Sequence, residues 1–186
     1  MKKAIVLAGA LCATALGGLS VSSAQTQTQT QPQPHQAPQP ALSKHHTDFV
    51  NDVAESNLTE VRLGQLVARN ATNEDVRKFA QRMVDDHTKL NAQLASLAQQ
   101  KGIALPSTLD KKHQEEVDKL AKETGDKLDR AYMSRMVDEH EKDVREFEKM
   151  AKDGKNPELR QFAASALPTL QDHLTQAKEI DARLKK

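Results

Sequence analysis

Four stretches of this sequence repeat apolar residues every three or four positions, and each stretch is far too long for a β-strand. They cover residues 47–70, 74–101, 127–152 and 157–184. This spacing is typical of amphipathic helices, and no stretch alternates apolar and polar residues as a half-buried strand would. A shorter helix is predicted over residues 107–122, where Ser107-Thr108-Leu109-Asp110 resembles a capping box. The sequence therefore predicts an all-α fold, a four-helix bundle with a short extra helix between its second and third long helices.

Each long helix is predicted to carry a polar residue among the apolar residues of its buried face: Glu60, with Asn57 on the same side, His87, His140 and His173. At a rise of about 1.5 Å per residue, Glu60 and His87 lie about 15 Å and 21 Å from the first interhelical turn. By the same measure, His140 and His173 lie about 20 Å and 24 Å from the last turn. Since each helix is about 40 Å long, all four residues are expected near mid-height, in either bundle topology.

An acidic residue accompanies each histidine. The stretch 82–89 recurs nearly unchanged as 135–142, with a weaker echo at 170–174. Asp86 precedes His87, Asp172 precedes the last histidine, and Asp143 follows the middle one by three positions. At about 100° per residue these carboxylates fall at the edge of the buried face or in solvent. We therefore expect Asp86, Asp143 and Asp172 to be additional ligands or hydrogen-bond partners of the histidines.

Three interpretations of this polar layer follow, because a buried imidazole or carboxylate without a partner costs several kcal/mol. In the first, Glu60, His87, His140 and His173 bind one divalent transition metal (Fe, Zn, Mn or Cu), which suits imidazole and carboxylate ligands. In the second, the same side chains form a closed hydrogen-bond network that only fixes helix register. In the third, the helical phase is shifted by about one residue and the histidines lie at the boundary beside solvated carboxylates.

The N-terminal 24 residues have the features of a secretory signal peptide. Lys2 and Lys3 precede an apolar stretch over residues 4–19, and small residues at 22–24 offer a cleavage site. Cleavage there would place the protein in the periplasm or outside the cell, and would leave no transmembrane span in the mature chain. An uncleaved N-terminal anchor is the alternative. The single cysteine, Cys12, lies within this segment, so the mature chain has no disulfide and no thiolate ligand.

Residues 25–42 form a polar tract rich in Gln, Thr and Pro, which predicts a disordered tether before a helical domain over residues 43–186. Without Lys2 and Lys3 the chain has 25 basic residues against 26 acidic ones. No basic block stands out, which argues against nucleic acid as a partner. Neither a nucleophile elbow, a phosphate-binding glycine loop nor a zincin motif occurs. A protein or cell-envelope partner and the oligomeric state are left open.

Three groups of residues carry a family resemblance: residues 79–87, residues 131–133 with 136–140, and residues 167–170 with His173 and Leu174. They resemble a bacterial family of unknown function, often labelled "predicted outer membrane protein" and placed among ferritin-like folds. The resemblance covers residues 43–180 and implies an exported ferritin-like bundle. Ferritin-like di-iron sites typically use Glu-x-x-His motifs, whereas Val84, Val137 and Leu170 stand three positions before the histidines here. A mononuclear, histidine-rich metal site therefore fits these residues better than a di-iron centre does.

Two functions are consistent with these observations. The first is an exported bundle that binds a metal at mid-height and serves metal handling or stress protection. The second is a non-catalytic interaction or structural protein in which the polar layer only sets register. An enzyme using one histidine as a base is a third, distant option, because no nucleophile or substrate pocket can be read from the sequence.

Overall fold

Five α-helices and no strand make up residues 42–152 and 155–186, the part of the chain that the computed structural model describes. All these residues belong to one unit, Pro38–Lys186. The helices are α1 (Lys44–Asn70), α2 (Glu74–Gln100), α3 (Lys111–Leu120), α4 (Gly125–Lys152) and α5 (Pro157–Leu184). The all-α prediction is confirmed, and the long helices begin and end within three residues of their predicted bounds. The predicted signal peptide and nearly all of the predicted tether lie outside the described residues.

Local side-chain chemistry sets several helix starts. The Asn73 side chain accepts hydrogen bonds from two backbone N–H groups in the first turn of α2, and Asn156 Oδ1 accepts one from Leu159 N at 2.8 Å. The predicted start of the short helix at Ser107 is wrong. The capping residue is Asp110, whose Oδ1 accepts from His113 N at 2.7 Å, so α3 begins one turn later.

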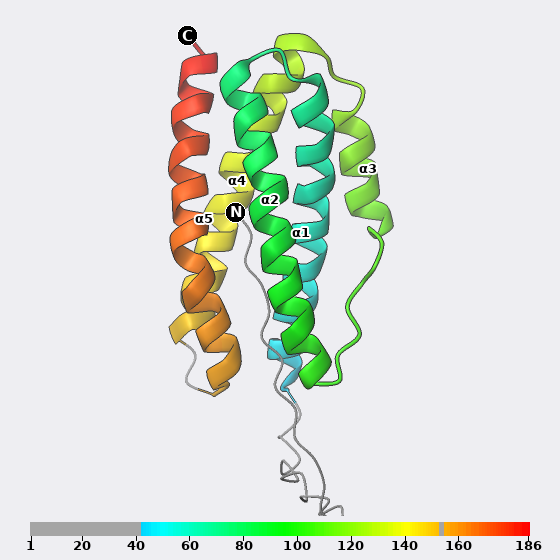
Figure 1. The fold of residues 1–186 in the computed structure, drawn as a ribbon, viewed down its shortest axis with the longest axis vertical. Coiled ribbons are helices and arrows are strands. Elements are labelled where there is room, and N and C mark those ends of the chain that lie inside the picture. Colours follow the sequence, from blue (N-terminus) through cyan, green and yellow to red (C-terminus); the bar gives the residue numbers. More distant parts are fainter. Residues whose placement is uncertain (1–41, 153–154) are drawn as a thin grey trace, which may run out of the picture. The chain divides into compact units, whose positions relative to one another are not determined.

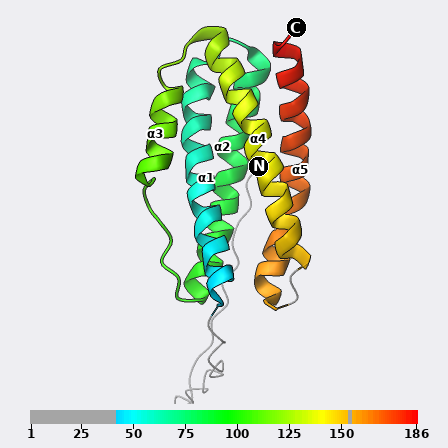
Figure 2. The same ribbon diagram turned by 180° about the vertical axis from the view of Figure 1, so that it is seen from behind.

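The connection through α3 decides the topology that the sequence left open. In Figures 1 and 2, α1 and α2 form one antiparallel pair and α4 and α5 form another, while α3 lies on the outside next to α1. At one end, Asp129 near the start of α4 accepts from Asn73 N at 2.7 Å, in the α1–α2 turn. At the other end, Lys101 after α2 pairs with Glu158 in α5 at 2.8 Å. Consequently α2 and α4 run in the same direction, because the chain returns along the bundle before α4 begins.

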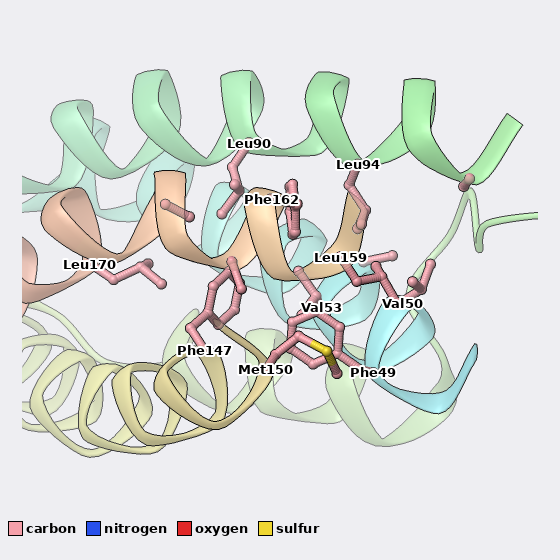
Figure 3. Packing of buried hydrophobic residues seen from close by; sticks show 14 residues of the cluster. Phe49, Val50, Val53, Leu90, Leu94, Phe147, Met150, Leu159, Phe162 and Leu170 are labelled. Carbon is pink, nitrogen blue, oxygen red and sulfur yellow. The ribbon is translucent and has the colours of Figure 1, made fainter. Parts of the chain in front are cut away.

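The apolar core consists of two clusters, one toward each end of the long helices. The first includes Phe49, Val53, Leu94, Phe147, Met150, Leu159 and Phe162 (Figure 3). The second includes Leu63, Val67, Phe79, Met83, Tyr132, Met136 and Ile180. On each long helix the two clusters are separated by a short gap in sequence, and the predicted polar residue lies in that gap. The fold thus places one polar layer between two apolar halves.

Candidate metal site

Four helices contribute the polar layer: Glu60 comes from α1, His87 from α2, His140 from α4 and His173 from α5. Their exposed fractions are only 0–1%. The centroids of the three imidazole rings form a nearly equilateral triangle with sides of 5.3, 5.4 and 5.6 Å. The helical phases predicted from the sequence therefore bring the three histidines together in the interior, and the boundary interpretation is wrong.

His87 presents one ring nitrogen to oxygen acceptors and leaves the other without a partner. Its Nδ1 lies 2.8 Å from Asn57 Oδ1 and 2.9 Å from Glu60 Oε2. The hydrogen-bond geometry is met toward Asn57, and the approach of the carboxylate adds charge attraction. Since an ionised carboxylate cannot donate, the proton belongs on Nδ1. The buried Nε2 has no hydrogen-bond partner among the described residues, so its lone pair is available.

His140 shows the same division within its own helix. Nδ1 lies 2.9 Å from the carbonyl oxygen of Met136, one turn earlier in α4. A carbonyl oxygen only accepts hydrogen bonds, so Nδ1 donates and carries the proton. The second nitrogen, Nε2, is buried and contacts no donor or acceptor that the structure describes. Its lone pair is likewise available.

His173 uses its nitrogens the other way round. Nε2 lies 3.1 Å from Asp86 Oδ2, so this nitrogen donates and Nδ1 is left buried without a partner in the described part of the chain. Asp86 is held in place by Arg82, whose Nε lies 3.2 Å from Oδ2, and by Lys89, whose Nζ lies 3.3 Å from Oδ1. Asp86, although next to His87 in sequence, therefore accepts a hydrogen bond from His173 of another helix.

The three histidines form a group that could hold a metal ion: one ligand atom from each ring lies within 4.8 Å of those of the other two. Imidazole nitrogens bind zinc at about 2.0–2.1 Å, which puts two such nitrogens about 3.4 Å apart at a tetrahedral centre. Histidines that bind metals usually donate their other N–H to a carboxylate or a backbone carbonyl. His140 has the Met136 carbonyl in this role and His173 has Asp86, while the Nδ1 of His87 meets the Asn57 amide oxygen with the Glu60 carboxylate 2.9 Å away.

Glu60, predicted as a fourth ligand, faces the protonated side of two rings. Besides its contact with His87, its Oε1 lies 3.7 Å from His140 Nδ1. Burial by itself raises the pKa of Glu60, but the close approach of His87, with charge attraction from His140 and His173, brings it down to about 2. Glu60 is therefore ionised at neutral pH. In this arrangement the Glu60 carboxylate lies near the protonated Nδ1 atoms of His87 and His140 and helps to orient these two rings.

The pKa values of His140 and His173 are lowered, which favours the neutral form that metal binding requires. Burial lowers the pKa of His173 to about 4, with repulsion from His87 and His140 adding to the effect. Burial also lowers the pKa of His140, against the attraction of Glu60. These rings are thus neutral at neutral pH, and each keeps one lone pair.

The three predicted acidic partners occupy different places. Only Asp86 contacts a histidine of the group, as described above. Asp143 is buried, and burial followed by the charges of Glu60 and Glu139 raises its pKa well above the ordinary value. Asp172 is half exposed and pairs with Arg82 Nη1 at 2.6 Å, so it reaches the site only through Arg82 and Asp86.

Two further residues belong to the polar layer and were not among the predicted site residues. Asn57 lies one turn before Glu60 and contacts His87. Tyr132 is fully buried, and its hydroxyl has no hydrogen-bond partner among the residues described. Burial and the charge of Glu60 raise the pKa of Tyr132 well above its ordinary value. The only signal for Tyr132 in the sequence is that the single tyrosine of the chain falls in an apolar stripe.

A second group, Glu55, Asp110 and His113, also brings ligand atoms within 4.8 Å of one another. His113 Nδ1 lies 2.8 Å from Asp110 Oδ1 and 3.7 Å from Glu55 Oε2. Asp110 is already the capping residue of α3. This partly exposed group is explained by the start of α3 and by surface charge pairing.

Comparison with known proteins places the chain in a family. A family described as "Domain of unknown function (DUF4142)" matches residues 31–180. The chain belongs to the DUF4142 family. No curated protein matches this DUF4142 chain. Within the residues that the structure describes, none of its helices is both long and apolar enough to cross a membrane.

Two solved structures resemble this DUF4142 chain in fold. A DUF305 fragment from Deinococcus radiodurans has a TM-score of 0.68 at 15% identity and covers 77% of this chain and 99% of its own. A protein from Streptomyces coelicolor, described as "putative secreted protein DUF305", has a TM-score of 0.62 at 12% identity. It covers 74% of this chain and 91% of its own. At such low identity these similarities establish the helical fold alone, and the labels "ferritin-like" and "outer membrane" stay predictions.

Proposed function

We propose that this protein is exported and binds one divalent transition metal between its four long helices, serving metal handling or stress protection. The ligands are His87 Nε2, His140 Nε2 and His173 Nδ1. The observation that carries the proposal is that these three buried nitrogens, one from each ring, have no partner among the described residues. Leaving such a buried group unsatisfied costs about 1–3 kcal/mol. A bound cation would satisfy all three at once.

The partners behind the ligands support this assignment. Asn57 Oδ1 and the Met136 carbonyl accept from Nδ1 of His87 and His140, with the Glu60 carboxylate 2.9 Å from the same His87 nitrogen, and Asp86 accepts from Nε2 of His173. These acceptors fix the tautomers and orient the lone pairs, which raises ligand basicity. We therefore move Glu60 from the ligand set to the supporting set, with Asp86. Asp143 and Asp172 have no direct contact with the histidines among the described interactions, and we give them no ligand role.

The candidate metals are those that accept imidazole nitrogen: Zn, Cu and Fe, with Mn less favoured by a site of three imidazoles. A tetrahedral or five-coordinate ion with three nitrogen ligands keeps at least one position for water. We further propose a cleaved signal peptide over residues 1–24, a disordered tether over 25–42 and a ferritin-like arrangement of the helices. The similarity to a protein described as "putative secreted protein DUF305" supports export.

A second function is favoured by the same hydrogen bonds. Each ring already donates to one oxygen acceptor without any metal: His87 to Asn57, His140 to the Met136 carbonyl and His173 to Asp86. The layer could therefore serve only to set the register of four helices around two apolar clusters, in a non-catalytic envelope protein. In that case loss of a histidine changes stability and not metal content.

Metal analysis of the tag-free mature protein separates the two functions. After exposure to Fe, Mn, Zn and Cu followed by desalting, the wild type is expected to retain about one metal ion per chain. His87→Gln, His140→Gln and His173→Gln each lose it. Wild-type protein that retains no metal contradicts the proposal. The register function then predicts that His140→Ala lowers the thermal midpoint while the metal content stays at zero.

A further inference from the structure

A pocket between α2 and α5 reaches the histidine group from outside. Its volume is about 160 Å³, and both His87 and His173 line it together with Asp86. Lys89, Ser165 and Thr169, all exposed, lie in the same lining. The pocket therefore extends from solvent-exposed side chains to two of the three rings that carry free nitrogens.

The size of the pocket limits what can enter. One water needs about 10–15 Å³ of such space, and drug-sized ligands occupy pockets of about 300–1,000 Å³. The pocket thus suits a few waters or one ligand of a few atoms. A larger polar pocket of about 300 Å³ on the α3 side includes Glu60 but none of the three histidines in its lining. The α2–α5 pocket is therefore the better route to the metal position.

The charges around the site determine the kind of ligand. On the pocket side, the cations Arg82 and Lys89 are balanced by Asp86 and Asp172. In the layer itself, the Glu60 carboxylate offsets one of the two charges of a divalent ion, which leaves one net positive charge in a buried place. A monoanion that replaces water on the metal would neutralise it, because an uncompensated buried charge is costly.

We propose that the α2–α5 pocket admits a small monoanion to an exchangeable position on the metal, an inference that rests on the proposed metal site. The three histidine nitrogens hold the ion and leave a fourth position open, as catalytic metal sites do. Because His87 and His173 both line the pocket, the open position is assigned to the side of the ion toward α2 and α5. The metal would then bind and exchange a small ligand, unlike a structural metal ion whose ligands all come from the protein.

Cobalt(II) and azide provide the test. Cobalt loaded into the tag-free mature protein reports its coordination through visible absorption, and azide is a monoanion of three atoms. The wild type is expected to show a saturable change in the cobalt spectrum on titration with azide. If azide leaves the visible spectrum of the cobalt-loaded wild type unchanged, the proposal is overturned.

Variants at the pocket mouth separate access from ligand chemistry. Thr169→Trp should cover the pocket, keep one cobalt per chain and weaken the apparent azide affinity at least tenfold. Thr175→Trp is the matched control, since Thr175 is exposed on the same helix and outside that lining. It should bind azide as the wild type does. Ser165→Trp repeats the test if Thr169→Trp does not fold, as judged by circular dichroism.

The outcomes distinguish this inference from the proposed function. If the wild type binds no stoichiometric cobalt before azide is added, the metal site itself is wrong and the pocket inference falls with it. If cobalt binds and Thr169→Trp still binds azide with wild-type affinity, the metal site stands and the α2–α5 route is wrong.

Discussion

Asp86 directly precedes His87 in the sequence, yet its carboxylate contacts His173, with Oδ2 3.1 Å from Nε2. His87 instead has Glu60 Oε2 2.9 Å from its Nδ1. These two histidines thus meet a carboxylate from another helix, and the adjacent Asp86–His87 pair in the sequence is not a structural pair. The consequence is that two contacts between helices fix which nitrogen of two rings is free.

Replacing the carboxylate behind His87 should weaken metal binding without abolishing it. Glu60→Gln keeps the size of the side chain and removes its charge, so the orienting attraction on two rings is lost. We expect metal affinity to fall about 10- to 100-fold, measured by competition with a chelator. Asp48→Asn, about three turns earlier on α1 and exposed, is the control and should leave the affinity unchanged. Equal affinities for Glu60→Gln and wild type would show that Glu60 has no supporting role.

Asp86 and Asp172 provide a matched pair, because both contact Arg82 and only Asp86 contacts a histidine. Asp86→Asn weakens the acceptor for His173 Nε2 and should lower metal affinity by about tenfold or more. Asp172→Asn should change it by less than about twofold. Isothermal titration with zinc measures both. A larger loss of zinc affinity in Asp172→Asn than in Asp86→Asn would contradict the direct role of the Asp86–His173 contact.

The metal-free protein should lose stability as the pH falls below neutrality. The pKa of His173 is lowered from 6.5 to about 4, and that of His140 is also lowered. Below about pH 6.5 the unfolded chain therefore binds more protons than the folded chain. The free energy of unfolding therefore decreases as the pH falls from about 6.5 toward 4. The contribution of His173 is on the order of 2–3 kcal/mol. The lowered pKa of Glu60 extends the loss below pH 4.5, down to about pH 2.

Urea unfolding at pH 7.5, 6 and 4.5 in a chelator measures this dependence. His173→Gln cannot take up the proton in either state, so its stability should vary less between pH 7.5 and 4.5 than that of the wild type. If the stabilities of wild type and His173→Gln change equally over this range, His173 takes up its proton in the folded protein and the explanation is wrong.

Gly64 is required by the close approach of α1 and α2. A Cβ at this position would lie 2.9 Å from the backbone oxygen of Ala80 and 2.9 Å from Val84 Cγ2. Gly64→Ala gains about 1 kcal/mol of helix propensity, but the backbone oxygen cannot move without separating the helices. We expect a net loss of about 1–3 kcal/mol in unfolding free energy, seen as a lower thermal midpoint. Adding Val84→Ala removes only the side-chain clash, so a full rescue would contradict this explanation.

Local sequence was sufficient to predict the four long helices and the polar layer. Periodicity and capping residues such as Asn73 depend on neighbours within one or two turns, and these can be read directly. The same periodicity placed Glu60 and the three histidines on buried faces at one height, where the structure has them. The start of α3 was missed because Ser107 and Asp110, three positions apart, are both candidate capping residues, and Asp110 is the one that accepts from the first turn of the helix.

The tertiary structure alone decided how these residues divide their roles. Successive residues on a helix point about 100° apart, so Asp86 cannot face the same neighbour as His87, and its partner depends on which helix packs alongside. The position of Glu60 behind the rings, the buried hydroxyl of Tyr132 and the return of the chain through α3 likewise depend on helices far apart in sequence. The sequence by itself determined that a buried polar layer exists. The packing of α1, α2, α4 and α5 determined which nitrogens in that layer are free.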